Sequence, residues 1–190
     1  MTLELADGSR MEFSEPLSAS LTATLESPAQ SLEITFPLEP GSAPAPAITA
    51  VVNRGSRRIF AGWCDQQTAR EDSGGRTLTI QARSRGAFLL DNEALPQTYY
   101  GVTGRELFRA HLAPYGFSLS NLEIPQDYPA GAFTVPKGMS EWEVFCAFCM
   151  RMYARLPVVT TGERVVVAQP SRSPVARITN RPGEEGLRYL

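Results

Sequence analysis

Residues 18–83 alternate between apolar and polar side chains with a period of two residues. One apolar row comprises Leu21, Ala23 and Leu25, and another comprises Leu32, Ile34 and Phe36. Side chains of a strand point alternately to its two faces, whereas an amphipathic helix repeats every 3.6 residues. The alternation therefore predicts half-buried β-strands throughout the first half of the chain.

Turn-forming residues divide this half into short segments. Residues 39–46 contain three prolines, which lack the backbone N–H of a strand ladder, so this segment is expected to be a loop or an exposed edge. Turns are also expected at residues 53–56 and at Gly74–Gly75. The pattern predicts about six short antiparallel strands in a small barrel or sandwich.

The second half contains two helix starts with the same signature. Thr103 precedes Glu106 by three residues, and Ser140 precedes Glu143 by the same spacing. This is the capping-box arrangement, in which hydroxyl and carboxylate groups bind free backbone N–H groups. Helices are expected from about Arg105 and Glu141, and short strands over residues 117–119, 156–160 and 164–168. The sequence thus predicts an α+β part with two similar helix–strand halves, and a β-rich α+β fold overall.

Few residues are available for catalysis or metal binding. The chain has three cysteines and one histidine, and Cys64, His111, Cys146 and Cys149 would form the only three-cysteine, one-histidine zinc set. Nothing in their spacing brings Cys64 or His111 close to the pair, and that pair falls within an apolar helix stripe. We therefore predict no metal, no cofactor and no enzymatic activity, with His111 as a hydrogen-bonded structural residue.

The charge balance limits the partners. The chain has 18 basic and 20 acidic residues, for a formal net charge of −2, which excludes a strongly basic nucleic-acid binder. The small cluster of Arg54, Arg57 and Arg58 is expected to be a solvated hairpin end. No apolar run approaches the ~18 residues of a membrane helix, and the start of the chain is acidic rather than signal-like. Synthesis in the cytoplasm, with reduced thiols and without membrane insertion, is expected.

The order of these features resembles that of phage tail baseplate hub proteins of the Mu-like and late-control D type. These proteins are similar to the hub part of type VI secretion spikes. The resemblance rests on the strands over residues 58–63 and 77–83, the segment 84–91 after them, the two capped helices and the hairpin ending at residues 165–170. It extends over roughly residues 18–170.

The resemblance implies a homotrimeric adaptor that joins the tail tube to the central spike and forms part of the DNA conduit, which DNA traverses without specific binding. Residues 1–98 would be a β-barrel tube domain, residues 99–170 the α+β domain, and residues 171–190 the start of a second tube domain or a C-terminal tail. A complete second tube domain does not fit in 20 residues, so a fragment or a shortened relative is expected.

The implied location is the baseplate of a virion or prophage tail, assembled in the bacterial host cytoplasm. The resemblance does not identify the residues of the subunit interface. The alternative is a carbohydrate-binding module for the cell wall, because the paired helices also resemble a LysM-like arrangement. Trp142, Tyr99 and Tyr100 would then supply stacking surfaces.

Overall fold

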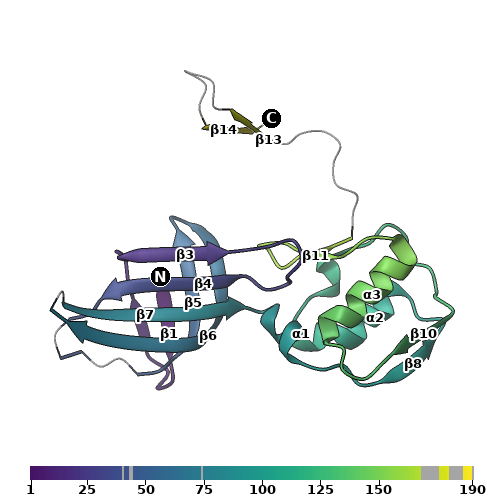
Figure 1. Cartoon of the computed structure of the whole chain (residues 1–190), viewed down its shortest axis with the longest axis horizontal. Coiled ribbons are helices and arrows are strands. Elements are labelled where there is room, and N and C mark those ends of the chain that lie inside the picture. Colours follow the sequence, from purple (N-terminus) through teal and green to yellow (C-terminus); the bar gives the residue numbers. More distant parts are fainter. Residues whose placement is uncertain (40, 43–44, 74, 168–175, 180–185, 190) are drawn as a thin grey trace.

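A seven-stranded antiparallel sheet forms the first part of the structure (Figure 1). The computed structural model describes residues 1–39, 41–42, 45–73, 75–167, 176–179 and 186–189, with side chains through Val167. The strands of the sheet are β1 (Thr2–Leu5), β2 (Arg10–Glu12), β3 (Ser18–Thr22), β4 (Ser31–Pro37), β5 (Ala47–Arg54), β6 (Arg57–Asp72) and β7 (Gly75–Ser84). Their spatial order is β2-β1-β5-β6-β7-β4-β3.

The sheet curls around one apolar core without hydrogen-bonded closure. Among the described residues β2 and β3 are its two edges and do not pair with each other, so the expected closed barrel is not found. The sheet cluster, which comprises the buried apolar residues from Leu3 to Ala82, combines side chains of β1 and β2 at one end of the sheet with those of β4, next to the other end. Phe13, just after β2, stacks on Phe36 of β4 with ring centroids 4.4 Å apart. Side-chain packing therefore brings the two ends together.

Three features of the sheet differ from the sequence-based expectation. The β1–β2 hairpin was not expected. β6 is one strand of 16 residues rather than two, because a bulge between Cys64 and Gln66 lets it bend without ending. β3 was expected to be half-buried, yet all five of its residues are exposed. Its alternation is real, but the strand lies at an edge where none of the residues that the structure describes buries either face.

The second part contains the helices, which lie beside the end of the sheet (Figure 1). Its elements are α1 (Ala87–Asp91), β8 (Gln97–Tyr100), α2 (Gly104–His111), the 3₁₀ turns at Ala113–Tyr115 and Leu119–Asn121, β9 (Leu122–Glu123), β10 (Ala132–Val135), α3 (Glu141–Tyr153), β11 (Val158–Val159) and β12 (Val165–Val166). β8 pairs with β10, and β12 lies between β11 and β9. The strand expected over residues 117–119 is wrong, because β9 begins later, after the second 3₁₀ turn. Neither α1 nor β10 was expected.

Beyond residue 167 the structure describes one hairpin, formed by β13 (Ala176–Thr179) and β14 (Gly186–Tyr189). Pro40, Pro44 and Gly74 of the expected turns lie outside the described residues. None of the helices in the described part of the chain has the length and apolar character needed to cross a membrane.

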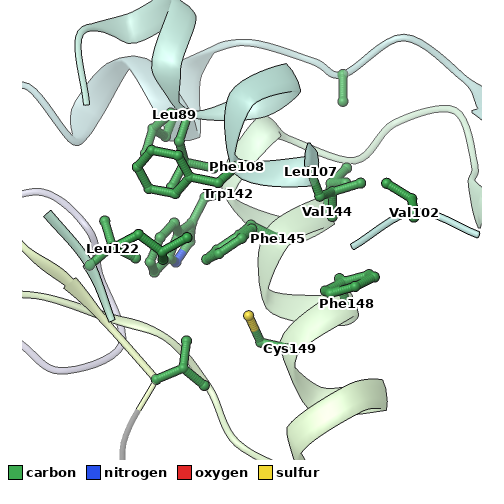
Figure 2. Packing of buried hydrophobic residues seen from close by; sticks show 14 of the residues in the cluster. Leu89, Val102, Leu107, Phe108, Leu122, Trp142, Val144, Phe145, Phe148 and Cys149 are labelled. Atoms are coloured by element: carbon green, nitrogen blue, oxygen red, sulfur yellow. The ribbon is translucent and has the colours of Figure 1, made fainter. Parts of the chain in front are cut away.

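A second apolar core fills the helical part. The helix cluster comprises the buried apolar residues from Leu89 to Val167. Figure 2 shows Trp142, Phe145 and Phe148 of α3 at its centre, near Phe108 of α2. The domain boundary at residue 98 remains a prediction, and Leu89, which precedes that position, already packs in the helix cluster.

A short joint connects β7 to α1. Arg83 on β7 pairs with Asp65 on β6 and with Asp91 on α1, in each case at 2.8 Å. Gly86 is buried against the backbone of Pro28, where a Cβ atom would lie 2.0 Å from the Pro28 carbonyl oxygen. Only a residue without a side chain fits this position.

Replacing Gly86 with alanine is therefore expected to lower the free energy of unfolding by about 1 to 3 kcal/mol, because the backbone of residue 28 must move. Gly131→Ala is the matched control, since a Cβ there meets nothing within 4 Å, and a change within about 0.5 kcal/mol is expected. Urea denaturation of the two variants measures the difference. Equal stabilities would contradict the close packing at Gly86.

Candidate functional site

Both capping boxes are present at the helix starts. At α2 the Thr103 hydroxyl accepts a hydrogen bond from the Glu106 N–H, and the Glu106 carboxylate accepts one from the Thr103 N–H at 2.8 Å. Ser140 and Glu143 make the same two contacts at α3. Hydrogen bonds from the backbone and hydroxyl of Thr103 lower the pKa of the Glu106 carboxyl. All four side chains cap the N-terminal start of a helix, which is a structural role.

His111 is the one buried charged or polar residue of the described sequence, with 3% of its surface exposed. Its Nδ1 donates a hydrogen bond to Glu141 at 2.5 Å, and its Nε2 contacts the hydroxyl of Tyr99 at 3.0 Å. Tyr115 also donates to Glu141, at 3.2 Å. Burial and then the Glu141 charge raise the pKa of both tyrosines.

This network ties α2, α3 and β8 together through polar groups inside the helical part. No serine, threonine or cysteine of the described residues is bonded to the His111 ring, so the geometry of a hydrolytic triad is not assembled. The sequence predicted a hydrogen-bonded structural histidine. Its partner Glu141 lies 30 residues away and carries no sequence signal beyond its place at a helix start.

The structure does not bring the four residues of the zinc alternative together. Cys64 packs against the sheet cluster, whereas Cys146 and Cys149 pack in or against the helix cluster. His111 is engaged by Glu141 and Tyr99. In the part of the chain that the structure describes, no group of three or more histidine, cysteine or carboxylate side chains could hold a metal ion.

The cysteines are expected to react slowly with thiol reagents. Burial, with a smaller effect of Asp65, raises the pKa of Cys64 to about 11, and burial raises that of Cys146 to about 12 and that of Cys149 further. A pKa raised from 9 to about 11 leaves Cys64 about 100-fold less thiolate at pH 8. A colorimetric disulfide reagent should titrate all three thiols quickly only in denaturant. Rapid reaction of the folded chain would contradict their burial.

The aromatic residues of the carbohydrate alternative do not form a common surface. Trp142 is 4% exposed inside the helix cluster, and the hydroxyl of Tyr99 forms a hydrogen bond with the His111 ring. Tyr100 alone is well exposed, at 81%. A sugar ring needs an open aromatic face, so this arrangement does not favour the LysM-like interpretation.

The arginine cluster lies where the sequence predicted. Arg54 and Arg57 flank the β5–β6 turn, and they and Arg58 are exposed. A hairpin end with three solvated guanidinium groups is an ordinary surface.

The edge strand β3 is the most distinctive exposed surface. Leu17, Leu21 and Leu25 are 62%, 41% and 76% exposed. The register places Leu21 opposite the buried Leu32, so Leu21 lies on the core-facing side of the sheet, past its last covered strand. Leu17 and Leu25 lie beyond the two ends of β3 and complete a row of exposed leucines. An apolar row at an uncovered edge is suited to contact with another protein chain.

The fold is shared with solved tail proteins. The chain is similar to the tail protein from Neisseria meningitidis MC58, with 17% identity and a TM-score of 0.68, over 91% of this chain and 51% of that one. It is equally similar to the 43 kDa tail protein of prophage MuSo2 from Shewanella oneidensis, with 17% identity and a TM-score of 0.68, over 92% of this chain and 55% of that one. The chain thus has the fold of these tail proteins and spans about half their length.

No family model matches the sequence, and no curated protein matches it. At 17% identity these two similarities show a shared fold and nothing more specific. They agree with the β-rich architecture expected from the sequence, and neither protein's name describes an enzyme.

Proposed function

We propose that this chain is a structural component of a phage tail and serves as an adaptor in the baseplate hub. The observation that carries the proposal is the agreement of its fold with two tail proteins over 91% and 92% of the chain. The order of strands, capped helices and hairpin, which resembles that of hub proteins, supports the finer assignment. The proposed site of action is the virion tail, after assembly in the bacterial host cytoplasm.

In this role three copies form a ring between the tail tube and the central spike, and DNA passes through it. Three copies at −2 each carry a net charge of −6, which favours passage over retention, because lysine and arginine contacts to phosphates are what hold DNA. The role requires no metal, cofactor or catalysis. The buried His111 network and the capped helices supply rigidity.

Light scattering on a size-exclusion column, over a concentration series, tests the ring. The expected species has a mass near 62 kDa, three times the 20.8 kDa of one chain. A monomer at every concentration would contradict a ring formed by this chain alone.

Gold labelling of a tagged chain in purified tail particles tests the position. The hub assignment predicts label at the end of the tube where the spike attaches. Label along the tube would support a tail component and overturn the hub assignment, and particles without label would overturn both.

A further inference from the structure

β3 lacks the features that keep an edge strand from pairing. No charged residue occurs between Pro16 and Leu25, and the five strand residues are exposed. Natural edge strands are usually blunted by charge, proline or a bulge within the strand. The opposite edge, β2, follows this rule, because its three residues include the exposed Arg10 and Glu12.

Residues 17–25 also read nearly the same in both directions. The segment is Leu-Ser-Ala-Ser-Leu-Thr-Ala-Thr-Leu, which is symmetric about Leu21 when serine and threonine are taken as equivalent. We propose that β3 pairs antiparallel with β3 of a second copy of this chain, centred on Leu21. β3 itself supplies the pairs Leu21 with Leu21 and Ser20 with Thr22. Residues 23–25 lie outside β3 in the single chain, and on pairing they would extend the strand and add Ala19 with Ala23, Ser18 with Thr24 and Leu17 with Leu25.

This pairing matches every side chain with one of its own kind. Apolar residues meet on the core-facing side and hydroxyl residues meet on the other side, where cross-strand neighbours lie about 4.5 to 5.5 Å apart between Cβ atoms. Ser20 and Thr22 can then hydrogen bond across the pair. The leucine row, exposed in one chain, then packs side by side with the row of its partner, which buries part of each leucine.

The same observations disfavour pairing between β3 and β2 of another copy. Such a contact would place Arg10 and Glu12 beside an uncharged strand, without an opposite charge for either of them on β3. Pairing between identical edges is isologous and links two copies only. The contact is therefore distinct from the threefold contact of the proposed hub, and it does not depend on that function.

Disulfide cross-linking tests the register. In the full chain with Leu21→Cys, the two thiols face each other within reach of a disulfide, so mild oxidation should give a covalent dimer near twice 20.8 kDa. Ala19→Cys is the matched control, because its two copies would lie about 13 Å apart along the strands. The unsubstituted chain controls for the native cysteines. Cross-linking of both variants alike, or of Ala19→Cys alone, overturns the register.

Light scattering tests the contact itself. The pairing predicts a wild-type mass near 42 kDa for two chains, or near 125 kDa if two of the proposed 62 kDa rings pair. Leu21→Lys should halve that mass or raise the dissociation constant of the pair at least tenfold, because two charges would meet at the centre. Leu95→Lys is the matched control, since Leu95 is 77% exposed and lies outside the sheet. A wild-type monomer at every concentration overturns the inference. A 62 kDa trimer that Leu21→Lys leaves intact, together with no cross-linking of the Leu21→Cys variant, also overturns it while supporting the proposed hub.

Discussion

Replacing Glu141 with alanine is expected to lower the free energy of unfolding by about 3 to 5 kcal/mol. His111 is 3% exposed and would lose the carboxylate that its Nδ1 contacts at 2.5 Å, and Tyr115 would lose the same acceptor. Removing one member of a buried polar pair leaves the other without compensation for its lost hydration. Urea denaturation, followed by the fluorescence of the buried Trp142, measures the change.

Glu143→Ala is the control for this variant. Glu143 lies in the same helical turn but binds only the exposed Ser140 N–H, so a loss of about 1 kcal/mol is expected. Glu141→Gln retains an acceptor oxygen without the charge. Its loss in the free energy of unfolding should fall between the losses of Glu141→Ala and Glu143→Ala. Similar losses in Glu141→Ala and Glu143→Ala would show that the His111 network contributes no more than a helix cap.

Replacing Phe145 with alanine is expected to lower the free energy of unfolding by about 3 to 5 kcal/mol, because the surrounding residues cannot fill the cavity left by the deleted ring. Phe145 is fully buried at the centre of the helix cluster (Figure 2). Its ring centroid lies 6.0 Å from that of Phe108 on α2 and 6.4 Å from that of Trp142 on α3. Hydrogen exchange of the α2 and α3 amides should accelerate accordingly.

Met150→Ala serves as the control for the ring deletion. Met150 lies on the same helix and is 47% exposed, so its truncation should change the free energy of unfolding by less than about 1 kcal/mol. If the two variants exchanged their α3 amides at the same rate, the central position of Phe145 would be contradicted.

The sequence predicted α2 and α3 well, because the determinants of these two helices are local, whereas it did not predict the short α1. Each capping box lies within four residues, and the stripe through Trp142, Phe145 and Cys149 follows from helical spacing alone. The alternation of Leu32, Ile34 and Phe36 likewise predicted the buried face of β4. Such patterns depend only on how neighbouring side chains point from one element.

Features that depend on distant parts of the chain could not be predicted in this way. The same alternation occurs in β3 and β4, yet only β4 has neighbours on both edges, so pattern alone does not distinguish exposed from buried strands. The apolar pattern of β6 is interrupted after Cys64, which in the sequence looks like the end of a strand, whereas in the structure it is a bulge within one continuous strand. The partnership of His111 with Glu141 depends on how α2 packs against α3, which no local spacing encodes.

The joint between β7 and α1 determines how the two parts respond to mechanical load. If the two parts were connected only by the backbone of Arg85 and Gly86, they could rotate relative to each other about the dihedral angles of this link. Here Arg83 spans the joint through Asp65 and Asp91, and the rings of Trp63 and Phe88 meet across it with centroids 4.8 Å apart. Rotation about the link would have to break these contacts together, so a torque applied to the sheet is transmitted to the helices.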